Sequence, residues 1–139
     1  MGKRSNFERM PRDYYPTPYK AVIPLLSHLT GEFTFAEPCA GDGILISHLV
    51  ENGGICTDAH DIEPMHEWVR YGDALSKSYT KCDYIITNPP WNRKILHPMI
   101  EHFVSQKPTW LLFDSDWMHT KQSIPYLKYL SKIVSIGRV

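Results

Sequence analysis

The sequence has few cysteines and no histidine pattern that would identify a disulfide-rich or metal-binding protein. Only three of its 139 residues are cysteines, and Cys39, Cys56 and Cys82 lie far apart. An odd number at these distances matches neither a disulfide framework nor a metal-ligand spacing. We interpret them as small apolar side chains of the interior. The seven histidines show no pair at metal spacing with a third partner, so we expect no metal.

Long apolar runs and an excess of one charge are also missing. No stretch approaches the ~20 apolar residues of a membrane span, and the basic N-terminus is not followed by the apolar core of a secretory signal. We therefore expect a cytoplasmic protein without a membrane partner. The formal net charge is zero, which gives no global argument for a nucleic-acid partner but leaves room for a local basic patch.

The length allows one domain with a real core and little more. Residues 13–139 are expected to form that domain, preceded by a polar and basic arm over residues 1–12. The basic side chains of the arm either bind nucleic acid or, as we favour, belong to a solvated tail. They are Lys3, Arg4, Arg9 and Arg12.

Strand and helix patterns alternate along the domain. Apolar runs predict strands over 33–38, 54–63, 81–87, 109–114 and 132–139, and residues 68–75 are expected to form a short strand and a loop. Apolar residues at helical spacing predict helices over 19–29, 44–53, 96–106 and 123–130. This alternation indicates an α/β fold with a mostly parallel sheet and right-handed crossovers.

Glycine and polar residues collect directly after the expected strands. The segments EPCAGDG, DIE, GDA, TNPPW and DSDWMH each follow one of them. In open α/β sheets, ligands bind outside the carboxyl ends of the strands. The agreement between these loops therefore predicts a binding site at that edge of the sheet.

The first of these loops contains two glycines. Gly41 and Gly43 permit a sharp turn and a close approach of the backbone to a ligand. The dinucleotide-binding fingerprint is incomplete because Ile46 stands at the third glycine position. A tight turn between a strand and a helix explains the glycine pair about as well as a ligand does.

Acidic residues indicate which kind of ligand would bind at this edge of the sheet. Glu37 and Asp42 would repel a phosphate and attract a cation. Asp61 ends the next strand, where an acid can bind ribose hydroxyls, and Asp73 can accept a hydrogen bond from an adenine amino group. An adenosine with a positive, phosphate-free tail corresponds to S-adenosylmethionine.

The segment TNPPWN, residues 87–92, ends the fourth expected strand with two prolines. The side-chain oxygen of Asn88 and the carbonyl of Pro89 can accept both hydrogens of an exocyclic amine. Pro89 and Pro90 would hold that carbonyl still. Trp91 offers a face on which a planar substrate can stack, worth ~1–3 kcal/mol. A plain turn at the end of a strand is the alternative.

In this order, EPCAGDG, DIEP, GDAL and TNPPW resemble the class I S-adenosylmethionine-dependent methyltransferases. The Asn-Pro-Pro-aromatic motif is similar to that of amino-group methyltransferases, chiefly the adenine-N6 DNA enzymes. It also occurs in enzymes that methylate glutamine amides of proteins or guanine amino groups of RNA. DYYPTP, residues 13–18, resembles the segment that closes over the methionine end of the cofactor. The likeness covers about residues 13–139 and is to small, often phage or prophage, members without a target-recognition domain.

The resemblance implies a cofactor, a substrate and roles for particular residues. It implies S-adenosylmethionine as cofactor, DNA as the partner, and the cytoplasm of a bacterium or phage-infected host as the location. The implied cofactor-binding residues are Thr17, Glu37, Pro38, Cys39, Ala40, Gly41, Gly43, Asp61, Ile62, Asp73 and Ala74. The implied catalytic loop consists of Asn88, Pro89, Pro90 and Trp91.

Three further residues are weaker candidates for substrate contacts. Arg93 and Lys94 follow the catalytic loop and either meet a phosphate or begin a solvated helix. Asp116, after the fifth expected strand, either contacts the substrate or, as we favour, caps the following turn. We do not expect His119 to be a ligand.

The family's sheet has a seventh strand, antiparallel and inserted between the fifth and the sixth. This chain reaches Val139 where that strand would follow, so either the sequence is truncated or the fold dispenses with the strand, and we expect a Rossmann-like methyltransferase sheet that lacks it. A strand edge would then be open to association with a second chain. A methyltransferase-like binding protein without catalysis is the alternative that this expectation favours.

Overall fold

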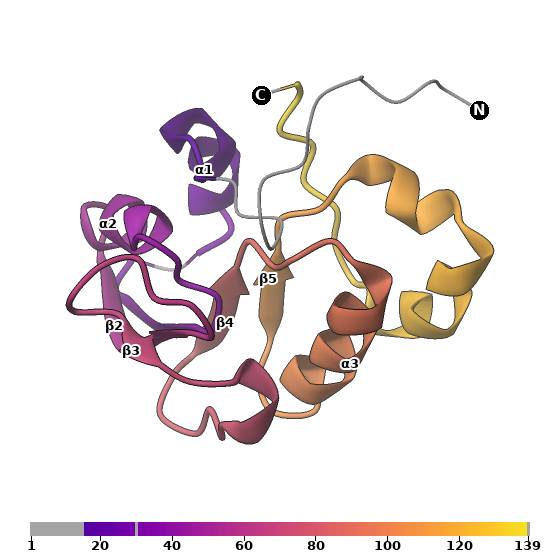
Figure 1. The fold of residues 1–139 in the computed structure, drawn as a ribbon. Helices are drawn as coiled ribbons and strands as arrows, with labels where there is room; N and C mark the ends of the chain where they lie inside the picture. Colours follow the sequence, from indigo (N-terminus) through magenta and orange to yellow (C-terminus); the bar gives the residue numbers. More distant parts are fainter. Residues whose placement is uncertain (1–15, 30, 139) are drawn as a thin grey trace.

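The computed structural model describes residues 16–29 and 31–138, and these form one sheet with helices on both faces (Figure 1). All five strands are parallel, in the order β3–β2–β1–β4–β5. They are β1 (Phe33–Glu37), β2 (Gly54–Asp61), β3 (Arg70–Tyr71), β4 (Tyr84–Thr87) and β5 (Thr109–Leu111). The predicted α/β class with a mostly parallel sheet is confirmed. The arm over residues 1–12 lies outside the described residues.

Two of the three described α-helices connect neighbouring strands, and the first precedes β1. The α-helices are α1 (Tyr19–Leu26), α2 (Ile44–Val50) and α3 (Arg93–Val104). Three 3-10 helices follow the strand ends: η2 (Ala74–Ser76), η3 (Ser115–His119) and η4 (Lys121–Tyr129). Within residues 16–29 and 31–138, no helix is long and apolar enough to cross a membrane.

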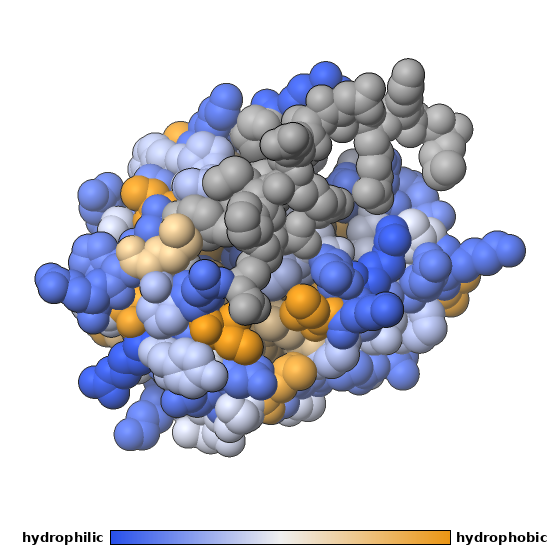
Figure 2. All heavy atoms as spheres, viewed as in Figure 1, coloured by the Kyte–Doolittle hydropathy of each residue, from blue (hydrophilic) through white to orange (hydrophobic). Residues whose placement is uncertain are grey.

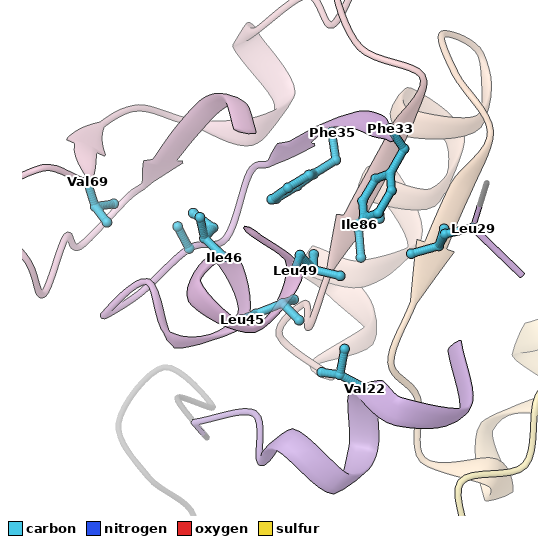
Figure 3. Close-up of a cluster of buried hydrophobic side chains, with 10 residues drawn as sticks. Val22, Leu29, Phe33, Phe35, Leu45, Ile46, Leu49, Val69 and Ile86 are labelled. Atoms are coloured by element: carbon cyan, nitrogen blue, oxygen red, sulfur yellow. The ribbon is translucent and has the colours of Figure 1, made fainter. Parts of the chain in front are cut away.

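Two apolar cores lie on opposite faces of the sheet, because successive side chains of a strand point to opposite sides. On β1, Phe35 belongs to one core and Ala36 to the other, and on β4 Ile86 and Ile85 divide in the same way. The first core packs the sheet against α1 and α2 (Figure 3). The second packs it against α3, chiefly through Phe103.

The predicted sixth strand, residues 132–139, is wrong. Residues 132–138 pair with no other strand among the described residues. Gly137 has a φ of 72°, which no regular strand accommodates, and Ile133 is 64% exposed. Apolar composition alone therefore predicted a strand where the segment finds no buried surface to cover. β5 is left at the edge of the sheet.

Other predicted elements exist with different boundaries. Residues 68–75, predicted as a short strand and a loop, form the two-residue strand β3 and then the start of η2, which Asp73 caps by accepting from the Leu75 amide. The helix predicted over 96–106 begins earlier, at Arg93, because the Asn92 side chain accepts from the Lys94 amide and starts it there. The last predicted helix is the 3-10 helix η4, which contains Pro125.

Candidate functional site

The strand order changes direction between β1 and β4, which are hydrogen-bonded neighbours. The loops that follow them therefore emerge side by side at the carboxyl edge of the sheet, the position where open α/β sheets bind ligands. One is the glycine loop, residues 38–43, and the other is the proline loop, residues 88–92. The structure thus brings together the two loops that the sequence predicted to share a site.

Thr17 connects the proline loop to the segment before α1. Its buried hydroxyl accepts a hydrogen bond from the Asn88 side-chain nitrogen at 3.2 Å. Its carbonyl oxygen lies 3.0 Å from Nε2 of His48 on α2. Because the Asn88 amide nitrogen points to Thr17, its amide oxygen points away from Thr17. The predicted participation of Thr17 therefore has a geometric basis, although 71 residues separate it from Asn88.

The glycine loop is held in a conformation that requires glycine. Gly41 and Gly43 have φ values of 55° and 81°, in the left-handed region that other residues rarely adopt. A Cβ added at Gly43 would lie 2.5 Å from the ring of Trp68. The Gly41 carbonyl accepts from the Met65 amide at 3.0 Å. The segment after β2 therefore packs directly over this loop.

Glu37, at the end of β1, is a buried carboxyl group in the middle of the site. It is 1% exposed, and burial raises its pKa from 4.5 to about 8, with the negative charge of Asp61 adding to the rise. The Cys39 amide donates to it at 2.9 Å and lowers the pKa in part. The Thr87 hydroxyl lies close enough to lower it too, but its geometry is too poor for a hydrogen bond. The group is therefore largely protonated at neutral pH.

Asp61, at the end of β2, joins its strand to the glycine loop. One carboxylate oxygen accepts from the Gly41 amide at 2.9 Å and the other from the Glu63 amide at 2.8 Å. A carboxylate can accept about four hydrogen bonds, so these two contacts leave capacity for ribose hydroxyls. The acid positions the loop whether or not it also binds a ligand.

The other predicted cofactor residues surround this group. Pro38 and Ala40 are buried in the glycine loop, and Ala74 is buried at the start of η2. Asp73 is exposed, and Ile62 is 49% exposed. The negative charges of Glu37, Asp61 and Asp73 all raise the pKa of the Cys39 thiol, after the larger effect of burial. Glu37, Asp61 and Asp73 therefore lie close enough to share one electrostatic environment at the ends of β1, β2 and β3.

The proline loop is fixed at both ends. Trp91 donates its indole N–H to the Leu112 carbonyl after β5 at 3.1 Å. The Leu112 amide in turn donates to the Thr87 carbonyl at 3.2 Å. Pro89 is buried and Pro90 half-buried. The backbone between Asn88 and Trp91 is thus held by two rigid rings and by the neighbouring strand.

The three weaker candidates have separate positions. Arg93 and Lys94 form the first turn of α3, where Lys94 is exposed and the Arg93 Nε atom is buried without a hydrogen-bond partner among the described residues. Asp116 is exposed within η3, and its amide donates to the Asp114 side chain at 3.1 Å. Asp114 caps this helix. Our expectation that Asp116 does so is wrong by two residues.

The cysteines are not activated nucleophiles. Burial raises the pKa of Cys56 to about 11 and also raises that of Cys82. Cys82 is buried, whereas Cys39 and Cys56 are half-buried. Cys39 directs its thiol to the Met99 sulfur at 3.9 Å. The part of the chain that the structure describes contains no group of three histidine, cysteine or acidic side chains that could hold a metal ion.

Sequence reasoning missed an aromatic group beside the proline loop. We define it as Phe113, Trp117, His97 and Tyr126. Phe113 stacks on Trp117 with ring centres 4.7 Å apart, and Trp117 donates its indole N–H to Nε2 of His97 at 3.0 Å. The Tyr126 ring lies 4.3 Å from that of His97. These residues come from α3, the end of β5, η3 and η4, so no sequence spacing reveals the group.

Comparisons with models of known protein families, with curated protein sequences and with solved structures gave no match.

Proposed function

We propose that this chain is an S-adenosylmethionine-dependent amino-group methyltransferase with a Rossmann-like methyltransferase sheet, and that it acts on N6 of adenine in DNA. One observation carries the proposal. The proline loop and the glycine loop lie side by side at the switch point of the sheet, and Thr17 bonds to Asn88 between them. A rigid pair of acceptors therefore lies beside the acidic side chains at the ends of the neighbouring strands.

The acidic side of the site suits this cofactor. When bound, S-adenosylmethionine would supply a methyl group on a positively charged sulfur. Glu37, largely neutral in the free protein because it is buried, would ionise more readily beside a positive charge. Asp61 would accept hydrogen bonds from the ribose hydroxyls, and Asp73 from the adenine amino group. Gly41 and Gly43 would allow close approach, since no side chain stands between backbone and ligand.

The proline loop supplies what an unreactive amine needs. The lone pair of an exocyclic amine is delocalised into its ring, so the nitrogen is a poor nucleophile. The Asn88 side-chain oxygen and the Pro89 carbonyl would accept both amino hydrogens and draw the nitrogen toward a tetrahedral geometry. The indole of Trp91, fixed by its bond to Leu112, would stack on the base. Such positioning can lower a barrier by ~7–11 kcal/mol, and in duplex DNA the base must first leave the stack.

The decisive test compares two asparagine substitutions. Asn88→Ala removes an acceptor from the amine and should reduce methyl transfer to DNA by a factor of about 10²–10³. Asn52→Ala is the matched control, because Asn52 follows α2 and its side-chain nitrogen donates to Tyr19 and to the His48 carbonyl. It should leave transfer within about twofold. Transfer of labelled methyl to DNA is measured, and the digested product should be N6-methyladenine.

Other outcomes would replace the proposal. Label found only in protein glutamine or in RNA would assign the chain to one of the other amino-group methyltransferases. Cofactor binding by calorimetry without any transfer would indicate a binding protein. Absence of cofactor binding at millimolar concentration would contradict the enzyme altogether.

A further inference from the structure

The zero net charge conceals two regions of opposite charge. Residues 16–92, which we name the acidic half, carry ten acidic and four basic side chains, a net charge of −6. Residues 93–139, the basic half, carry three acidic and seven basic side chains, a net charge of +4. The boundary falls between the proline loop and α3. A surface that suits polyanions therefore begins where the proposed substrate site ends.

Lysines of the basic half lie on the surface and follow η4. Lys121 begins this helix, Lys128 is in its last turn, and Lys132 lies just beyond it. All three are exposed. In the view of Figure 2, hydrophilic side chains extend from the right-hand side, where Figure 1 has the gold ribbon of η4. The chain from Lys121 to Lys128 would rise about 14 Å in a straight 3-10 helix, the length of roughly four stacked nucleotides.

Exposed apolar and aromatic side chains alternate with these lysines. Ile124 and Ile133 are each 64% exposed, Leu130 is 46% exposed and Tyr129 is 38% exposed. Lys128 holds its ammonium group 5.1 Å from the centre of the Tyr129 ring. Phosphates alone would not require this apolar surface, but unstacked bases would find faces to pack against on it.

A series of contacts connects η4 to the proline loop. Trp91 bonds to Leu112, the next residue Phe113 stacks on Trp117, and Trp117 bonds to His97 of α3. Farther along, Tyr126 packs on His97. A strand lying along η4 would thus lead toward the loop that contains Asn88.

The three acids of this half do not cancel the positive charge. Glu101 accepts the Tyr129 hydroxyl at 2.7 Å and brings one negative charge to the end of η4, and Asp114 accepts the Asp116 amide as the cap of η3. Asp114 and Asp116 lie at the end nearer β5, before the lysines of η4. Four positive charges of the half remain in excess.

We propose that η4 and the segment after it, residues 121–133, bind single-stranded nucleic acid, with Lys121, Lys128 and Lys132 on the phosphates. The identification of that strand as DNA, and its role as the substrate track of the methyl-transfer site, rests on the proposed function. Charge complementarity and interleaved apolar side chains favour a single strand over a duplex, because a duplex presents its phosphates and hides the faces of its bases.

The test measures binding without any cofactor, so that it does not depend on methyl transfer. The probe is a fluorescein-labelled 20-nucleotide DNA of mixed sequence, titrated between 50 and 200 mM salt, beside the same duplex and the same sequence as RNA. Lys121→Gln/Lys128→Gln should weaken single-strand binding roughly 25-fold at 0.1 M salt and reduce the slope of log K against log salt by about 1.4. Lys20→Gln/Lys81→Gln removes two exposed lysines of the acidic half and should change binding less than twofold.

Each outcome decides for or against this surface. Equal binding of DNA and RNA single strands supports it, and so does intact DNA binding in a protein that transfers no methyl group, which counts only against the proposed function. Tighter binding of the duplex, equal weakening by the two double variants, or no binding at 50 mM salt would overturn it. Thermal unfolding of both variants checks that their folds are unchanged.

Discussion

The acidic half and the basic half differ in how many of their polar side chains are buried. The acidic half contributes four of the five strands, and it buries Glu37 and Thr87 at the ends of two of them. The basic half has α3, one strand and two 3-10 helices, and among its described residues Ser123 is the only polar one that is buried. The surroundings of an ionisable group that is buried at a sheet edge can shift its pKa. An exposed charge, in contrast, attracts groups of opposite charge. The first arrangement suits a small ligand, and the second suits an extended polyanion.

Of the tests of this difference between the halves, the one at Glu37 has the largest expected effect on the free energy of unfolding. Its pKa rises from 4.5 to about 8 on burial, so between these values the folded protein binds more protons than the unfolded one. The free energy of unfolding should therefore fall as pH rises through this window, by up to about 5 kcal/mol in total. Glu37→Gln should abolish the fall and make the protein more stable than the wild type at pH 8. Urea unfolding between pH 5 and 8.5 measures both.

Two controls belong to this experiment. Glu51→Gln changes an exposed glutamate after α2 and should leave the pH dependence unchanged. Saturating S-adenosylmethionine should flatten the wild-type profile, because a nearby cation favours ionised Glu37. A wild-type stability that rises from pH 5 to 8 would contradict the buried neutral carboxyl.

The apolar cores provide the next test of the difference between the halves. Phe35 is 0% exposed between β1 and the helices of its face, whereas Ile133 is 64% exposed beyond η4. Phe35→Ala should lower the free energy of unfolding by about 3–5 kcal/mol. Ile133→Ala should change it by less than about 0.5 kcal/mol. Equal losses in urea unfolding would show that residues 132–138 are packed against a surface after all.

Trp117 offers a smaller effect within the basic half. Trp117→Phe removes the indole N–H that His97 accepts and should cost about 1 kcal/mol at pH 7.5. Trp68→Phe, on a residue of the acidic half that is 44% exposed, serves as the matched control and should cost less than about 0.5 kcal/mol.

The pH dependence of this effect runs opposite to that of Glu37. The pKa of His97 is lowered, first by burial and then by the charge of Arg93, so below its ordinary value of 6.5 the unfolded protein binds more protons. Stability from this group is present above pH 6.5 and is lost as pH falls through the lowered pKa. Protonated His97 cannot accept from Trp117, so the cost of Trp117→Phe should shrink as pH falls through the lowered pKa. A cost independent of pH would contradict this hydrogen bond.

Much of the fold could be predicted because its local patterns agree with its tertiary packing. The runs FTFAE and YIIT are apolar on both sides, as strands covered by helices on both faces must be. The segment KIVSIGRV has a similar composition, yet residues 132–138 do not pair. A segment forms a strand only if a neighbouring strand can bond to it and another element covers its side chains. The composition of the segment itself predicts neither.

The candidate site divides in the same way. Gly41, Asp61 and Asn88 could be predicted, because a glycine, an acid and an amide directly after buried strands together indicate a binding site. The bond between Asn88 and Thr17, the indole of Trp68 over Gly43 and the aromatic group around His97 could not. The charge division between the two halves was readable from the sequence, but a net charge of zero concealed it until the fold supplied a boundary.

The sequence by itself determined the order of the elements, the rigidity of the proline loop and the types of polar group at the strand ends, because backbone restriction and apolar periodicity are local properties. Only the tertiary structure decided that strand β4 lies next to β1, that Glu37 is buried deeply enough to hold its proton, and that the aromatic group links η4 to the proline loop. Neighbours in space, and the loss of water that comes with them, depend on chain segments far apart in sequence.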